Sequence, residues 1–457
     1  MTLIDIPIKK SSHRAVSHPV SYHDLYDRLL AEDSAVDRTA YDLLRQQLKL
    51  AAELPLDLPS QPEALAQWSE AHCADVAAQY AEYLSARQQG ADRRYFRNKS
   101  HALYFLQHVA PTKEVDGAWL AGIPTHWQDQ RFDYLLDTYL EELGDGVPRQ
   151  NHVVIYRKLL AEHDCADLQG LADEYFLQGA LQLALGRFGD EFLPEVIGYN
   201  LGYEQPPLHL LISSYELAEL GIDPQYFRLH VTIDNASTGH ARKAVQALLR
   251  LIPAGPERED FYRRMTVGYR LNDLGKGSTA VIQEFDLQRA VVSMLERKAI
   301  FGQHMHSDYC RIEDRTINQW LAAPGQMADF LAALERKSWI KRGQPVEQSR
   351  FWRLIEGSEA VMFGVFNGYE KQLLSDWITG DCPDNAHRPY VARRGAAADE
   401  QIEIADAEQR TLEKSLENLP PVEQMRKLQP WLQPQRHWRP AGLFATRRFI
   451  QLRDRLR

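Results

Sequence analysis

Apolar residues recur every three to four positions along most of the chain, and this helical period constrains the fold more than any other feature. In residues 36–53, for example, Leu44 and Leu48 lie on the same helical face. Segments rich in β-branched residues, or with strict alternation of apolar and polar positions, are scarce. The sequence therefore predicts an all-α protein. We expect helices at residues 36–53, 62–88, 98–109, 132–143, 152–162, 168–186, 191–204, 206–220, 226–253, 258–273, 284–304, 314–336 and 347–377.

The chain has 457 residues, too many for one hydrophobic core, so two or three packed helical units are expected. Segments with proline and glycine at residues 54–62 and 110–130 indicate a linker and a long loop. We therefore expect an N-terminal helical arm with its linker in residues 1–61, a core bundle in residues 62–300, and a C-terminal helical domain with a basic tail in residues 301–457.

Composition argues against several classes of function. The formal net charge is −10, whereas a protein devoted to nucleic-acid binding needs a clustered basic surface. No apolar run approaches the roughly 18 residues needed to cross a bilayer, and the N-terminal residues do not have the pattern of a signal peptide. The four cysteines are scattered and form no CxxC pair, so we expect a cytoplasmic protein. Glycine-rich phosphate loops and a GxSxG nucleophile motif are also absent.

A carboxylate and an imidazole lie on either side of a predicted turn. Glu142 ends an amphipathic helix, which Gly144 and Pro148 then break. His152 begins the next helix, so the turn brings Glu142 and His152 close together. A single glutamate at a helix end is more often only solvated, and this pair needs other polar residues nearby to form a site.

The helix expected at residues 191–204 is apolar nearly all round, which indicates that it is buried. It nevertheless carries Glu195 and Glu204. A buried carboxylate is costly unless it is paired with a base or bound to a metal. Both interpretations stay open for these two residues, with Glu204 preferred as the metal ligand and Glu195 held in reserve.

The segment from His230 to Gly239 and His240 gives the sharpest signal. His230 and Asp234 are four residues apart and therefore share one helical face. His240 follows Asp234 by six residues, a spacing that turns it roughly 120° away on a regular helix. We therefore predict a bulge or break near Gly239, which would allow His240 to face inward.

Together the three segments offer three carboxylates and three imidazoles. Bridging carboxylates with terminal histidines suit two iron or manganese ions inside a helical bundle. A zinc enzyme needs fewer ligands, and a calcium site does not favour imidazole. The candidate ligands and catalytic residues are Glu142, His152, Glu204, His230, Asp234 and His240.

The order and spacing of these segments resemble those of the haem-oxygenase-like di-iron oxidases. The resemblance rests on EELGDG with NH in residues 141–152, GYNLGYE in residues 198–204, and YFRLHVTIDN with GH in residues 226–240. It covers about residues 130–250, and KAIFGQHMHS and MFGVFNGYE further on are similar to long-form members identified as iron-containing redox enzymes. It implies a haem-oxygenase-like bundle in which the six residues above hold two Fe²⁺ ions. Family members have two or three residues between the aspartate and the last histidine, whereas this chain has five.

The resemblance implies dioxygen as co-substrate and a small amine or amino acid as substrate. The expected reaction is N-oxygenation, with or without loss of a carboxylate to give an oxime. An external electron donor and a homodimeric assembly are compatible with this hypothesis. Three alternatives stay open: oxidative carbon–carbon fragmentation or desaturation on the same fold, a metal-free thiaminase-like enzyme, and a non-catalytic helical protein with salt-bridged carboxylates.

Overall fold

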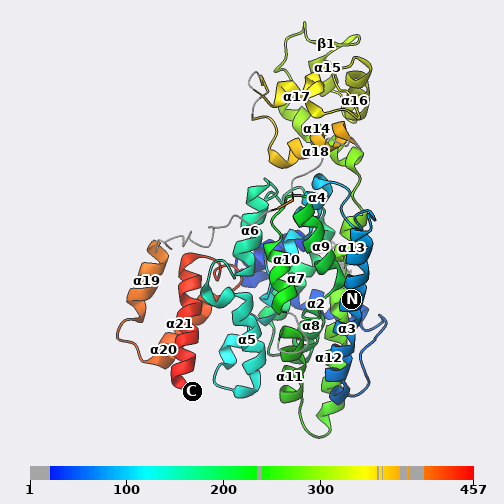
Figure 1. Ribbon diagram of the computed structural model, residues 1–457. Helices are drawn as coiled ribbons and strands as arrows, with labels where there is room; N and C mark the ends of the chain where they lie inside the picture. Colours follow the sequence, from blue (N-terminus) through cyan, green and yellow to red (C-terminus); the bar gives the residue numbers. More distant parts are fainter. Residues whose placement is uncertain (1–20, 234–238, 358–359, 363, 381–388, 391–405) are drawn as a thin grey trace, which may run out of the picture.

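The computed structural model of the chain describes residues 21–233, 239–357, 360–362, 364–380, 389–390 and 406–457. Within these ranges the protein is built almost wholly from helices (Figure 1). One antiparallel pair of two-residue strands is present, with Arg311 opposite Thr316 and Ile312 opposite Arg315. The prediction of an all-α protein is therefore confirmed.

The described helices fall into three groups that we name the body, the upper lobe and the side unit (Figure 1). The body contains α1 Tyr22–Leu30, α2 Asp37–Ala51, α3 Leu65–Gln88, α4 Lys99–Lys113, α5 Asp133–Glu142, α6 His152–Glu162, α7 Leu177–Arg187, α8 Leu193–Tyr203, α9 Leu208–Glu219, α10 Gln225–Ile233, α11 His240–Leu251, α12 Glu257–Arg270 and α13 Ser278–Gln283. The upper lobe contains α14 Leu287–Gly302, β1 Arg311–Ile312, β2 Arg315–Thr316, α15 Ile317–Leu321, α16 Met327–Arg336, α17 Arg350–Ile355 and α18 Gly368–Thr379. The side unit contains α19 Ala407–Leu416, α20 Pro421–Leu428 and α21 Pro440–Leu456.

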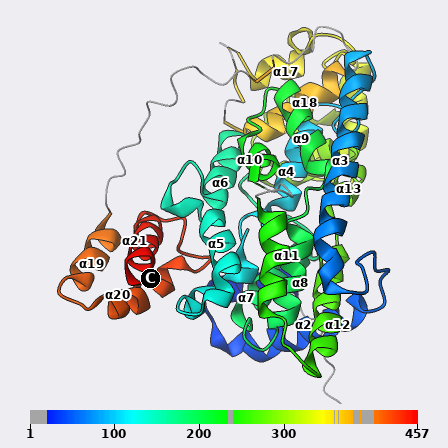
Figure 2. The ribbon, with the colours of Figure 1, turned by 60° about the horizontal axis from the view of Figure 1, so that its bottom comes forward.

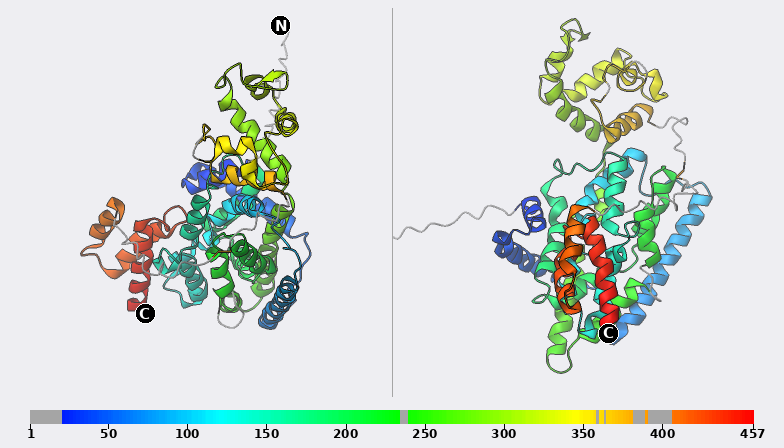
Figure 3. Two further views of the ribbon diagram at one scale, coloured as in Figure 1. Left: turned by 45° about the horizontal axis from the view of Figure 1, so that its top comes forward. Right: turned by 90° about the vertical axis from the view of Figure 1, so that its left-hand side faces the viewer.

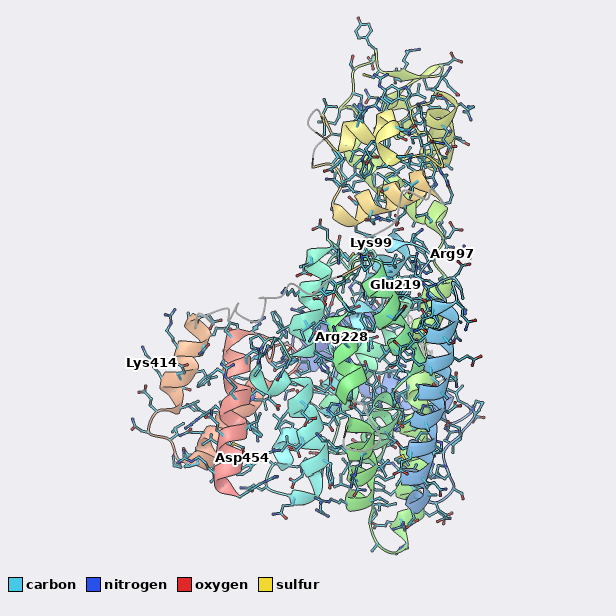
Figure 4. All side chains as sticks on the ribbon, in the orientation of Figure 1. Arg97, Lys99, Glu219, Arg228, Lys414 and Asp454 are labelled. Carbon is cyan, nitrogen blue, oxygen red and sulfur yellow. The ribbon has the colours of Figure 1, made fainter. Side chains whose placement is uncertain are left out.

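Two hydrophobic clusters hold these parts together. One joins the body to the side unit and includes Leu140 of α5 and Phe449 of α21. The other joins α4, α6, α9 and α10 of the body to the upper lobe and includes Phe105 and Trp377. Figures 2 and 3 show α21 lying beside the body next to α5, and the upper lobe capping one end of the body. The α5 helix thus belongs to one cluster, and α6 and α10 belong to the other.

The closest helix pair of the body is α8 with α12. The two backbones approach so closely at Gly198 that a Cβ atom there would lie 1.9 Å from the carbonyl oxygen of Met265. Only glycine fits such an approach. The contact fixes α8 against the body, and α8 ends at Tyr203 with Glu204 as its C-cap residue.

Some predicted boundaries are wrong. The segment 347–377 is not one helix but contains α17 and α18, because Asn367 and Glu370 form a capping box that starts a new helix. The segment 314–336 likewise contains both α15 and α16. The expected loop at residues 110–130 begins inside α4, which includes Pro111, and then runs through the interior. Proline and glycine there predicted a loop, and the segment is instead helical at its start and largely buried.

Within the described residues, every helix is too short or too polar to cross a lipid bilayer.

Candidate metal centre

Four buried side chains from separate elements converge at the junction of the two hydrophobic clusters. They are Asp116, Glu142, His152 and His230, and their ligand atoms lie within 4.8 Å of one another. The Nδ1 atom of His152 is 2.5 Å from Glu142 Oε2 and 3.6 Å from Asp116 Oδ2. The Nε2 atom of His230 is 3.3 Å from Asp116 Oδ2. We call these four residues the first cluster.

A second cluster of buried ligand atoms adjoins the first and consists of Glu142, Glu204 and His240. The Nδ1 atom of His240 is 2.9 Å from Glu204 Oε2 and 3.5 Å from Glu142 Oε1. Glu142 belongs to both clusters, with Oε2 turned to the first and Oε1 to the second. A carboxylate divided in this way has the placement of a bridge between two metal ions.

A tight turn between α5 and α6 sets Glu142 beside His152. Gly144 has φ of 63°, and a Cβ atom there would lie 2.2 Å from the backbone nitrogen of Asn151, so the turn requires glycine. The side chain of Asn151 caps α6 by accepting a hydrogen bond from Val154 N at 3.0 Å. His152 is therefore the first residue of a capped helix, directly across the turn from Glu142.

The side unit supports this turn from outside. The amide of Asn151 donates to His437 Nδ1 at 3.0 Å, and the hydroxyl of Tyr139 donates to the carbonyl of Leu432. Burial, together with the nearby Arg157 guanidinium and His152, lowers the pKa of His437 to about 3, so this ring stays neutral. Neutral His437 can accept the amide hydrogen bond, which holds Asn151 and hence His152 in place.

Asp116 is held by hydrogen bonds from two tyrosines. Its Oδ1 accepts a hydrogen bond from Tyr203 at 2.8 Å and its Oδ2 accepts one from Tyr226 at 2.5 Å. Burial alone would raise the pKa of Asp116, but the Lys113 ammonium and His152 hold it well below its usual range. Asp116 is therefore an ionised carboxylate with a fixed orientation, as a metal ligand requires.

Two of the three histidines, His230 and His240, are oriented by a hydrogen bond on the ring nitrogen that faces away from the clusters. His230 Nδ1 lies 2.9 Å from the carbonyl of Tyr226, so it carries the proton and leaves the Nε2 lone pair directed at Asp116. His240 Nε2 lies 2.6 Å from Glu141 Oε2, and Glu141 also pairs with Lys243. Such outer contacts fix the tautomer of a metal-binding imidazole.

The donor set fits two divalent first-row metal ions. Glu142 Oε2, His152 Nδ1 and His230 Nε2 are fully buried and make no hydrogen bond among the described residues, although Glu142 and His152 approach to 2.5 Å. Burial opposes protonation of His152, but Glu142 and Asp116 raise its pKa to about 10. A metal ion would replace that proton. Mixed carboxylate and imidazole ligands in a helical bundle favour iron or manganese.

Of the six ligands predicted from sequence, the structure brings five together: Glu142, His152, Glu204, His230 and His240. Asp234 lies outside the described residues. Glu195 is elsewhere, in a two-point ion pair with Arg264 of α12 at 2.7 Å for each contact. The salt-bridge interpretation is therefore correct for Glu195, and Glu204 is the acidic residue that lies in a cluster.

The predicted break near Gly239 is present. Gly239 is extended, with φ of −85° and ψ of −165°, and His240 is the first residue of α11. The expectation of a single helix over residues 226–253 is therefore wrong, and the calculated 120° offset of His240 does not apply to a new helix. The negative φ also means that the break does not use a left-handed glycine conformation.

Sequence reasoning missed Asp116. The acid follows Pro111 and precedes Gly117, and this segment was expected to be a long loop. In the structure Val115, Trp119 and Leu120 beside it are almost fully buried. The available signal was the apolar character of VDGAWL around a single acid, since a buried acid needs a partner.

A cavity of about 520 Å³ lies away from this centre, where the upper lobe meets the body. Its lining includes Tyr104 of α4, Arg297 of α14 and Tyr369 of α18, and it includes no residue of either cluster. It is therefore separate from the candidate metal centre.

Residues 103–273 match the family model described as "iron-containing redox enzyme", of the haem-oxygenase type. The matched segment includes every residue of both clusters. Neither a curated protein nor a solved structure matches the chain.

Proposed function

Residues 103–273 of the chain belong to the haem-oxygenase-like family of iron-containing redox enzymes, and from this premise we propose that the protein is a non-haem di-iron oxygenase acting on a small amine or amino acid. The family makes the protein an oxidoreductase. The observation that carries the di-iron assignment is the division of the Glu142 carboxylate between two adjoining buried clusters.

In this proposal Asp116, His152 and His230 would hold one iron and Glu204 and His240 the other, and Glu142, which belongs to both clusters, would be shared between them. Asp234 is a further predicted ligand. When bound, two Fe²⁺ ions supply the electrons with which dioxygen is reduced.

The chain's own residues have three tasks around these ions. The carboxylates of Asp116, Glu142 and Glu204 neutralise the charge of the metal. Tyr203 and Tyr226 keep Asp116 oriented through their hydroxyl groups. Apolar side chains of both hydrophobic clusters surround the site and exclude bulk water, which strengthens each electrostatic contact inside.

We favour N-oxygenation of the substrate, with or without oxidative decarboxylation to an oxime. Carbon–carbon fragmentation or desaturation would use the same centre. A thiaminase-like reaction would need a reactive thiol. Cys165 is buried and burial raises the pKa of its thiol, and neither Cys165 nor another described cysteine belongs to a ligand cluster. A purely structural role would leave the orphaned ligand atoms of the first cluster without a purpose.

The test is to add Fe²⁺ to metal-free protein without oxygen, count the bound iron, and then measure dioxygen consumption with amines and amino acids. We expect two iron ions per chain and oxygen uptake that depends on both. Products made under ¹⁸O₂ would show the label on nitrogen if the reaction is N-oxygenation. Folded protein that binds no more than one iron at saturation would refute the di-iron assignment.

A further inference from the structure

Lys113 is a buried cation next to the candidate metal centre. It is the last residue of α4, and only 9% of its surface is exposed. Its ammonium donates one hydrogen bond, to the hydroxyl of Tyr203 at 2.7 Å, and it lies 4.9 Å from the ring of Tyr203 and 5.8 Å from that of Tyr226. Among the described residues no carboxylate lies within ion-pair distance of it.

This single hydrogen bond leaves two N–H donors of the Lys113 ammonium without a partner among the described residues. A lysine has three N–H donors, and the neutral phenol of Tyr203 uses one of them. Taking an ammonium out of water is costly unless hydrogen bonds and an opposite charge replace its hydration. Other described lysines near the body and upper lobe, such as Lys276 and Lys298, have direct carboxylate partners. Asp116 acts on Lys113 only across Tyr203 and Tyr226, so the ammonium keeps N–H donors for a further anion in direct contact.

The position of Lys113 connects it to the metal centre through two phenols. Tyr203 accepts from Lys113 and donates to Asp116, and Tyr226, whose ring also faces the ammonium, donates to the other oxygen of Asp116. An anion bound by Lys113 would therefore be separated from Asp116 of the first cluster by the side chains of Tyr203 and Tyr226.

Two polar residues of α9 lie on one helical face on this side of the protein. Burial and the nearby Lys113 ammonium lower the pKa of His209 to about 4, so its ring is neutral and Lys113 is the local cation. One turn further along, the hydroxyl of Ser213 is fully buried and has no hydrogen-bond partner among the described residues. Both side chains can donate to or accept from a polar ligand.

We propose that Lys113 anchors a carboxylate of the substrate. This inference rests on the proposed function and narrows it, because the substrate would then be an amine that also carries a carboxylate. A single ammonium matches the single charge of a carboxylate more closely than the two charges of a phosphate.

The experiment compares each of the twenty common amino acids with its carboxamide, which keeps the amine but lacks the negative charge. Thermal shifts of the metal-free protein select the pair with the strongest response, and calorimetry then gives both dissociation constants. We expect the wild-type protein to bind the acid at least about tenfold more tightly than the amide, as charge-assisted hydrogen bonds are roughly twice as strong as neutral ones.

In Lys113→Met we expect this preference to disappear, and in Lys113→Arg, which keeps the charge, we expect it to return. Lys298→Met is the matched control, because that ammonium already pairs with Glu370 at 2.8 Å. Circular dichroism checks folding, and Lys113→Gln, which keeps a hydrogen-bond donor, replaces the Met variant should the latter not fold.

Two results would overturn the assignment: a wild-type protein that binds no acid more tightly than its amide, or a preference that survives in Lys113→Met. Iron is counted separately on the same preparations. A protein that prefers the acid through Lys113 but binds no iron would disprove the proposed function and leave the anchor standing.

Discussion

The two clusters of the candidate metal centre have similar side chains but different support. In the first cluster both oxygens of Asp116 accept phenol hydrogen bonds, one buried and one part-buried, and His230 is fixed by a backbone carbonyl. In the second cluster His240 is backed by Glu141, whose side chain is 37% exposed and which pairs with Lys243. The side chains of the first cluster are thus held by neighbouring phenol and backbone groups. The second cluster instead depends on Glu141, a partly exposed side chain that links His240 to Lys243.

The helix starts that carry His152 and His240 also differ in how well they are stabilised. His152 begins α6 behind an asparagine whose side chain caps the helix. His240 begins α11 behind extended Gly239, which has no side chain to do so. An asparagine cap contributes about 1 kcal/mol to a helix, so the two histidines start from unequally stabilised positions. We infer that the first ion binds more tightly than the second.

The largest effect is expected at the residue that both clusters share. Glu142→Ala removes a ligand from each ion, and since loss of an outer contact alone costs about 10–100-fold in affinity, the loss here should exceed a hundredfold at both positions. Iron analysis after dialysis should find no bound metal. Glu195→Gln is the matched control, because Glu195 pairs with Arg264 and should leave two iron ions bound. Retention of both ions in Glu142→Ala would rule out the bridge.

Removal of one ligand from each cluster tests the comparison directly. Asp116→Ala should lose the first ion and His240→Ala the second, so titration of each variant should fall from two iron ions per chain to one. The ion that remains in His240→Ala should be the tighter of the two, because both oxygens of Asp116 are held by phenol hydroxyl groups. If Asp116→Ala keeps the tighter ion, the order of the two positions is reversed.

A smaller effect is expected from the relay behind His240. Glu141→Gln weakens the acceptor for His240 Nε2 and should lower the affinity of the second ion about 10–100-fold while the first is unchanged. Calorimetric titration with Fe²⁺ resolves the two events. Glu162→Gln, an exposed acid of α6, serves as the control. Equal weakening of both ions would show that Glu141 does not act through His240.

The smallest effect concerns acid stability near the first cluster. The pKa of His437 is about 3 in the folded protein, lowered by burial, and about 6.5 when the chain is unfolded. The unfolded chain therefore takes up the proton first, and stability falls as the pH drops below 6.5. Between pH 6.5 and 5 the protonation of His437 in the unfolded chain lowers the free energy of unfolding by about 2 kcal/mol. Denaturant titrations of wild type and His437→Gln should show a weaker pH dependence in the variant. Identical slopes would contradict this assignment.

The periodicity of the sequence was sufficient for the fold class and for most helices, because amphipathic faces are local. It also identified Glu142, His152 and His230, each of which is marked by a turn or by a neighbour on the same helix. Asp116 could not be found in this way. Its burial depends on packing among α4, α8 and α10, which join positions far apart in the chain. The same holds for the Glu195 ion pair, since Arg264 is 69 residues away.

The contacts of the side unit with the turn between α5 and α6 also fix an order of events during synthesis. Leu432 and His437, which receive the hydrogen bonds of Tyr139 and Asn151, leave the ribosome roughly 300 residues after Glu142, or about 15–60 s later at 5–20 residues per second. Until then the nascent chain holds Glu142 and His152 on an unsupported turn. The turn that carries Glu142 and His152 therefore gains this outer support only after residues 432–437 have left the ribosome.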